Sequence, residues 1–318
     1  MGYNEVKAGE RGAKTAVLFS FIGCPAMIVS LIPEPNQETP QSEFCNPYVI
    51  TTSGILTLTT DYGMQDGYVA AMKGVILEIN SDIRIVDISH QISPQDVMEG
   101  AFILRNTASN FPEGTVHLAV VDPGVGTDRK AIALNYKGQI LLGPDNRLFS
   151  LLISGSDAEL IVELDKTQFW NSPTPSSTFH GRDVFAPVAA HLTTGLSLST
   201  AGTPLSNIKT MHWALPMADD QGIQGWVVHV DRFGNCITNI TRELFEKTQS
   251  GRPFKCYAGN TIIDQMSGTY GSVDRGDATL LFNSSEFVEI AIYRGSASQL
   301  FDIRKGNPVN LVFTDHKS

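Results

Sequence analysis

The chain has 318 residues, of which 42% are hydrophobic, so it can bury a sizeable core and is long enough for two domains. Its net charge of −10 opposes binding to a phosphate backbone, and the chain has no basic stripe, so we expect no nucleic-acid partner. No two of the four cysteines form a C-x-x-C pair. We therefore expect no zinc knuckle and interpret the cysteines as free, buried thiols.

The first 53 residues differ in composition from the rest. Basic residues such as Lys7 and Arg11 precede an apolar run over 16–32, and a proline-rich stretch follows, which is the order of a signal peptide. Acidic residues dilute the basic start, no cleavage site is clear, and the run is short for a membrane span. Export, anchoring through residues 14–33 and a disordered leader stay open, and residues 1–53 are left out of the predicted fold.

From residue 54 onward, apolar runs of strand length alternate with helical patterns. Ser93 is predicted to cap the second helix, with Pro94 at its first position and Asp96 reaching back. This alternation predicts a mostly parallel sheet covered by helices on both faces, in a domain spanning residues 54–218. The predicted strands are 55–60, 83–88, 115–121, 131–135, 139–142 and 160–164, and the predicted helices are 68–79, 94–110 and 182–193.

Two carboxylates directly follow predicted strands of this sheet. Asp61 comes after the first strand, and Asp122 comes after the third. Ligands of such sheets bind beyond the carboxyl ends of the strands, so we expect both side chains at one rim.

After residue 222 the helical signal ends. Short apolar runs separated by Gly, Asn and Asp predict a small β-barrel domain over residues 222–318. Its predicted strands are 226–230, 236–240, 254–258, 279–282, 287–292 and 309–313.

Several segments are unusually polar for their apolar surroundings. They are Thr59–Gly63, Val121–Arg129, Ser177–Asp183, Val230–Asn235 and Tyr293–Ala297. In this order they resemble the S-adenosyl-L-methionine (SAM) hydroxide adenosyltransferases, which are relatives of SAM-dependent fluorinating and chlorinating enzymes. The resemblance runs from about residue 55 to residue 313. It implies a three-layer α/β domain before the β-barrel, and a homotrimer whose sites lie between one subunit's first domain and a neighbour's second.

The resemblance also implies the activity: water attacks the ribose C5′ of SAM, which yields adenosine and methionine without a separate cofactor. The residues matching the family's catalytic positions are Asp122, Arg129 and His180. Halogenating relatives carry an uncharged residue in place of the aspartate and an inserted loop earlier, whereas residues 111–121 run straight through here. Both departures favour water over halide as the nucleophile.

Further positions match the family's ligand contacts. Asp61 matches the ribose-binding aspartate, and Asp231 matches the carboxylate that receives the methionine ammonium. A tryptophan of the halogenases is replaced by Gln95. The remaining matches are Asp66 near the amino-acid end, Asn235 at the adenine edge, Phe233 as an aromatic face, Ser284 at the methionine part, and the backbone around Arg294 at the adenine.

The three catalytic candidates suit the attack of water. Arg129 stays protonated, so it stabilises developing hydroxide and cannot act as the base. His180 titrates in a useful range, and Asp122 can orient either partner, so the proton acceptor stays open between these two. Each residue considered alone also has a structural interpretation without catalysis. Asp122 could form a turn, Arg129 could be a solvated surface charge, and His180 could cap a helix.

Two other functions remain compatible with the sequence. One is halogenation of SAM, and the other is binding or sensing of adenosine or SAM without turnover. The substrate favours a cytoplasmic location, whereas the leader leaves export open.

Overall fold

The computed structural model describes residues 51–153, 158–211 and 215–314 of the chain. All of these residues belong to one compact unit. Residues 1–50 of the predicted leader lie outside the described residues, and with them the proposed anchoring segment 14–33 and two of the cysteines, Cys24 and Cys45. In the parts of the chain that the structure describes, no helix is long and apolar enough to cross a bilayer.

The first sheet has seven strands in the order β2-β1-β3-β5-β4-β6-β7. Strands β2, β1, β3 and β5 run parallel, β6 runs in the same direction, and β4 and β7 run opposite to them. The prediction of a mostly parallel sheet is therefore confirmed. The strands are β1 (Ile55–Thr60), β2 (Arg84–Ser89), β3 (Val116–Val120), β4 (Ala131–Tyr136), β5 (Gln139–Pro144), β6 (Ala158–Glu163) and β7 (Thr203–Pro204).

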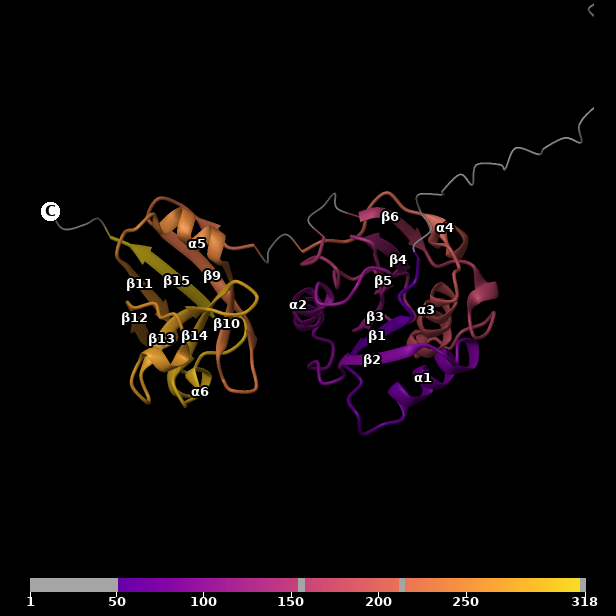
Figure 1. The fold of residues 1–318 in the computed structure, drawn as a ribbon, viewed down its shortest axis with the longest axis horizontal. Coiled ribbons are helices and arrows are strands. Elements are labelled where there is room, and N and C mark those ends of the chain that lie inside the picture. The colour runs from indigo at the N-terminus through magenta and orange to yellow at the C-terminus, as the bar shows by residue number, and fades with distance from the viewer. Residues whose placement is uncertain (1–50, 154–157, 212–214, 315–318) are drawn as a thin grey trace, which may run out of the picture. The chain divides into compact units, whose positions relative to one another are not determined.

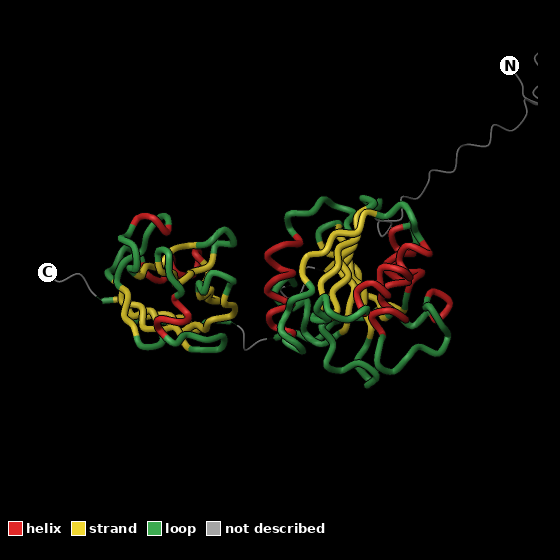
Figure 2. Tube along the Cα trace, turned by 90° about the horizontal axis from the view of Figure 1, so that it is seen from below, coloured by secondary structure: helices red, strands yellow, loops and turns green. Residues whose placement is uncertain are grey.

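Helices cover this sheet on both faces, which makes three layers (Figures 1 and 2). On one face, α1 and α3 bury Met72, Ile76 and Val188 against the strands, and on the other face α2 buries Ala101 and Leu104. The central strands β1 and β3 are almost fully buried, as expected for parallel strands covered on both sides. The helices are α1 (Tyr68–Ile79), α2 (Val97–Ala108), α3 (Ala186–Thr193) and α4 (Leu198–Ala201), with helical turns η1 (Thr167–Phe169) and η2 (Gly181–Phe185).

Helix α1 begins and ends as predicted, whereas the starts of the other two predicted helices differ from their predicted positions. Helix α2 is capped by Asp96, whose side chain accepts a hydrogen bond from the Glu99 amide, and not by Ser93. Gln95 has a φ of 67°, so right-handed helical backbone cannot begin before it. The predicted helix 182–193 is divided, because its first residues form the π-helical turn η2 and only the rest is α-helical.

The second sheet is a nearly closed antiparallel barrel, as predicted. Its strand order is β12-β11-β15-β9-β10-β14-β13, with β8 beside β9, and a bridge from Met266 to Leu280 links its two ends. Cys236 and Cys256 are buried in it as free thiols. The strands are β8 (Met217–Ala218), β9 (Gly222–Val230), β10 (Cys236–Thr241), β11 (Phe254–Ala258), β12 (Thr261–Ile263), β13 (Ala278–Phe282), β14 (Phe287–Ile292) and β15 (Pro308–Phe313), with α5 (Arg242–Gln249), η4 (Tyr270–Ser272) and α6 (Ala297–Phe301).

Candidate active site

A buried ion pair lies in the loop that follows β3. The Arg129 Nε atom is 3.0 and 2.9 Å from the two Asp122 carboxylate oxygens, and Nη2 is 2.5 Å from Oδ2. The side chains are only 6% and 4% exposed, so the solvated-surface interpretation of Arg129 is excluded. Two nitrogens of one guanidinium bind one carboxylate, which fixes the orientation of both groups.

The glycine-rich backbone of this loop brings it against the segment before His180. Gly126 has a φ of +76°, and a Cβ atom there would lie 2.3 Å from the Ser177 carbonyl oxygen. Only glycine fits both conditions. The Asp122 carbonyl also accepts a bond from the Val125 amide, so its backbone forms the expected turn while its carboxylate binds Arg129.

His180 completes this group. Its Nδ1 atom is 2.9 Å from Arg129 Nη2, and it makes no capping bond to the turn η2 that follows it. A guanidinium only donates hydrogen bonds, so Nδ1 accepts, and the neutral ring carries its proton on Nε2. Burial lowers the pKa of His180, and the charge of Arg129 lowers it further. The structure thus brings together the three predicted catalytic residues around a neutral histidine.

A second ion pair holds the His180 segment in place. Arg182 Nε donates to Asp183 Oδ1 at 2.7 Å, as the sequence predicts for these neighbours. Asp183 is buried, and its other oxygen accepts a bond from the Ser176 amide at 2.9 Å. These bonds join the start of η2 to the residues before His180, which restricts the position of the imidazole.

Asp61 lies at the end of β1, as predicted. Its Oδ2 atom accepts a 2.7 Å bond from the Gln95 amide. Burial raises the pKa of Asp61, and the charge of Asp122 contributes to the rise. Burial also raises the pKa of Tyr62, whose environment includes the charges of Asp61, Asp122 and Arg129. Asp61, Asp122, Arg129 and His180 are called the rim site below.

Sequence reasoning did not single out Tyr62, although it stands inside the first polar segment. The contact from Gln95 was also missed. It is made by the backbone, so the identity of the side chain at this position carries no signal for it.

The predicted residues of the barrel form a separate group around one turn between β9 and β10. Asp231 Oδ1 accepts bonds from the Phe233 and Asn235 amides, each at 2.9 Å, and Oδ2 accepts from Asn235 Nδ2 at 3.0 Å. The Phe233 side chain extends outward and is 76% exposed. Ser284 lines a cavity of about 460 Å³ together with Asp231. This cavity is called the barrel pocket.

The two remaining predicted residues are exposed to solvent. Asp66 is exposed before α1, and Arg294 is exposed with a φ of 59°, its guanidinium 5.4 Å from the Tyr293 ring centre. Among the described residues, no hydrogen bond or ion pair links the rim site to the barrel pocket.

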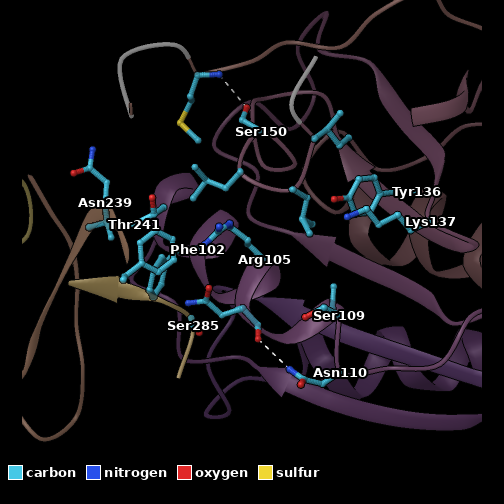
Figure 3. A pocket seen from close by; sticks show the side chains of 18 of the residues that line it. Phe102, Arg105, Ser109, Asn110, Tyr136, Lys137, Ser150, Asn239, Thr241 and Ser285 are labelled. Carbon is cyan, nitrogen blue, oxygen red and sulfur yellow. Dashed lines mark hydrogen bonds between the residues drawn. The ribbon is translucent and has the colours of Figure 1, made fainter. Parts of the chain in front are cut away.

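A larger cavity, of about 1250 Å³, adjoins the barrel pocket and shares Phe102, Asn106, Ser284 and Ser285 with it. Phe102 and Arg105 of α2 line it together with Asn239 and Thr241 of the barrel (Figure 3). The Arg105 guanidinium is 4.4 Å from the ring centre of Phe287. No residue of the rim site lines this cavity. Among the residues that the structure describes, no group of three His, Cys, Asp or Glu side chains could hold a metal ion.

Comparison with known proteins agrees with this geometry. The family described as SAM hydroxide adenosyltransferase matches with its N-terminal domain over residues 56–202 and with its C-terminal domain over residues 225–310. The rim site lies in the first matched region. Most residues of the barrel pocket lie in the second, while Phe102 and Asn106 of α2, which also line it, lie in the first.

Individual relatives cover most of the chain. An (R)-S-adenosyl-L-methionine hydrolase of Methanocaldococcus jannaschii is 35% identical over 277 residues, which is 81% of this chain and 96% of that protein. A Thermus thermophilus protein of the same name is 37% identical over 80% of this chain and 97% of its own. A fluorinase of an Actinoplanes species is 30% identical over 62% of this chain and 75% of its own.

A solved structure supports the same relationship. The crystal structure of an uncharacterized conserved protein from Thermotoga maritima is 35% identical and has a TM-score of 0.75. It matches 81% of this chain and 99% of its own. The chain therefore belongs to the SAM hydroxide adenosyltransferase family.

Proposed function

We propose that this protein hydrolyses S-adenosyl-L-methionine to adenosine and L-methionine. The observation that carries the proposal is the buried Asp122–Arg129 pair bound to a neutral His180 at the carboxyl end of β3. The family match and the hydrolases that are 35–37% identical over nearly their whole length support it.

The proposed reaction is a displacement at the ribose C5′. A water oxygen forms the new C5′–O bond while the C5′–S bond breaks. The electron pair of the C5′–S bond leaves with sulfur, so methionine departs as a neutral thioether. Asp61 binds the ribose hydroxyls and thereby holds C5′ in line with the water. The sulfonium charge disappears as the oxygen loses a proton, and a site shielded from solvent favours this neutralisation.

The arrangement of the triad suggests the path of the proton. Both Asp122 oxygens accept bonds from Arg129, and the single Nδ1 lone pair of His180 accepts the bond from Arg129 Nη2. In the proposed reaction the attacking water replaces this last contact, so that it accepts a bond from Arg129 Nη2 and donates one to the freed Nδ1 of His180. We therefore assign proton acceptance to His180, stabilisation of the developing hydroxide to Arg129, and positioning of Arg129 to Asp122.

The same proposal covers the organisation of the molecule. As the resemblance to the family implies, we propose a homotrimer in which the rim site of one subunit and the barrel pocket of a neighbour form each site. We place the domains at residues 54–218 and 222–318, with Phe233, Asn235, Ser284, the Arg294 backbone and Asp66 contributing substrate contacts. Because SAM is a cytoplasmic compound, we propose that the protein acts in the cytoplasm. We also propose that the reaction needs no separate cofactor.

Product analysis in water enriched with heavy oxygen tests the activity. The purified protein should release adenosine from SAM and carry the label at the 5′-hydroxyl, and both sulfonium epimers should be supplied separately. Parallel reactions with chloride and fluoride should form no 5′-halogenated product. A halogenated product would establish the halogenase alternative, and unchanged bound ligand would establish a binding protein instead.

A further inference from the structure

A buried carboxylate in the barrel pocket has no part in the proposed chemistry. Glu289 lies in the otherwise apolar strand β14 and is only 3% exposed. The Tyr270 hydroxyl donates a 2.7 Å hydrogen bond to its Oε1 atom. Both side chains line the cavity of about 460 Å³ that Asp231 and Ser284 also line.

This pocket carries negative charge without a balancing cation. Asp231 and Glu289 both face it, and none of its described lining residues is Lys or Arg. Buried carboxylates are ordinarily paired, because removing a charge from water is costly. An unpaired set of this kind is suited to a cationic ligand, which would supply the missing charge.

The number of free acceptors indicates how such a ligand would be held. Asp231 Oδ1 already accepts two amide bonds, and Oδ2 accepts one, which leaves Asp231 about one free acceptor position. An ammonium group has three N–H donors. The further acceptors in the pocket include the remaining lone pairs of the Glu289 carboxylate, which accepts bonds from Tyr270 and Asn283, and the oxygen of Tyr270, whose only hydrogen is given to Glu289.

We propose that Glu289, oriented by Tyr270, is a specificity-determining residue that receives the ammonium group of the substrate's amino-acid end together with Asp231. This inference rests on the proposed function, because it assigns a residue to the recognition of SAM. Ligands that carry the same adenosyl sulfonium but no primary ammonium should then bind more weakly than SAM, because they lack the contact with Glu289.

The charges around Glu289 give the inference a pH signature. Burial raises the pKa of Glu289 and the charge of Asp231 raises it further, while the bonds from Tyr270 and Asn283 oppose the rise. The remaining titratable neighbour, the Cys236 thiol, has a pKa raised to about 12 by burial and stays neutral. An ammonium favours ionised Glu289, so binding releases a proton and strengthens as the pH rises through the pKa of Glu289.

The test compares SAM with its deamino analogue, which keeps the sulfonium and the carboxylate but lacks the ammonium. In Glu289→Gln, the KM for SAM should rise by about 10- to 100-fold, because one charged hydrogen bond is lost. The kcat for SAM and the KM for the deamino analogue should stay within about twofold of wild type, since neither depends on this bond. Tyr270→Phe should shift the KM for SAM in the same direction by a smaller factor, and the pH dependence of KM should flatten in Glu289→Gln.

The matched control is Glu286→Gln, a nearby exposed carboxylate that pairs with Arg242, and it should leave both ligands unaffected. Equal losses for both ligands, or wild-type discrimination in both Glu289→Gln and Tyr270→Phe, would overturn the inference. Calorimetric titration of both ligands measures the same discrimination without turnover. A wild-type protein that binds SAM selectively but releases no adenosine would therefore refute the proposed function and leave this inference intact.

Discussion

The rim site and the barrel pocket handle charge in opposite ways. At the rim, Arg129 satisfies both oxygens of Asp122 and also binds His180, so the buried charges are matched before any ligand arrives. In the barrel pocket, Asp231 and Glu289 face a cavity whose described lining has no cation. The first arrangement suits preorganised chemistry, whereas the second is completed by what it binds.

This difference predicts which experimental quantity each region controls. A charge that stabilises developing hydroxide acts in the transition state and changes kcat, whereas a carboxylate that holds a ligand's ammonium acts equally before and during reaction and changes KM. The predictions below are designed to separate the two regions.

The largest effect is expected from removing the cation of the rim site. Arg129→Met should lower kcat by roughly 10³-fold, because the stabilisation of developing hydroxide is lost. SAM affinity measured by calorimetry should change only a few-fold. The charge of Arg129 also lowers the pKa of His180, so the acidic limb of any residual activity should move to higher pH.

A neighbouring cation provides the control for this substitution. Lys130 is half-exposed and pairs with Glu163, so Lys130→Met should keep wild-type kcat. Circular dichroism and the unfolding midpoint should confirm that Arg129→Met is folded, because the change strands a buried carboxylate. A folded Arg129→Met protein with wild-type kcat would remove the rim site from the mechanism.

A second experiment joins the two regions through the proposed trimer. Asp231→Asn should raise the KM for SAM, so each of Arg129→Met and Asp231→Asn is impaired in a different half of the site. If the halves come from neighbouring subunits, co-expressed mixed trimers restore about one quarter of the sites to wild-type composition. Adenosine release at low SAM concentration should recover accordingly. Mixtures no more active than the average of the two separate variants would place both halves in one chain.

Much of the rim site could be predicted from the sequence. Asp61 directly follows β1 and Asp122 comes two residues after the end of β3, and the carboxyl ends of parallel strands meet at one edge, so their proximity follows from topology. The contacts of Gly126 and Gln95 did not follow, because they depend on backbone dihedral angles and carbonyl positions. A sequence pattern indicates the properties of side chains. These two residues make their contacts through the main chain, so the pattern does not predict them.

The barrel pocket shows a different limit. Asp231 and Asn235 belong to one short segment, so their association in a turn was predictable. Tyr270 and Glu289 are 19 residues apart, and only the closing of the barrel brings them together. A signal for Glu289 did exist, since it is a carboxylate inside the apolar run 287–292, where a buried charge requires a partner or a function.

The smallest expected effect is on the pH dependence of stability. It compares the buried titratable groups in the cores of the two regions. His117 of β3 is fully buried beneath the rim and bonds Thr57 at 2.8 Å, and burial lowers its pKa to about 4. The unfolded chain protonates this histidine near pH 6.5. In the barrel, the pKa of Glu289 is shifted the opposite way, so its protonated form is the one that folding favours.

The two shifts give opposite signs with pH. Between about pH 6.5 and pH 4 the unfolded state binds the proton of His117 and the folded state does not, so acid should reduce the free energy of unfolding of the first sheet by up to about 3 kcal/mol. The contribution of Glu289 to the free energy of unfolding is fully present below the pKa that Glu289 has in the unfolded chain, and it is lost as the pH rises through the folded pKa. The barrel should therefore become more stable in acid. Hydrogen exchange, corrected for intrinsic rates, should show strands β1 and β3 losing protection at pH 5 before β10 and β14. In His117→Asn, which cannot titrate, this pH dependence should largely vanish. If both sheets lost protection together in the wild type, their pH responses would be coupled, and the contrast between the two regions would be confined to their binding sites.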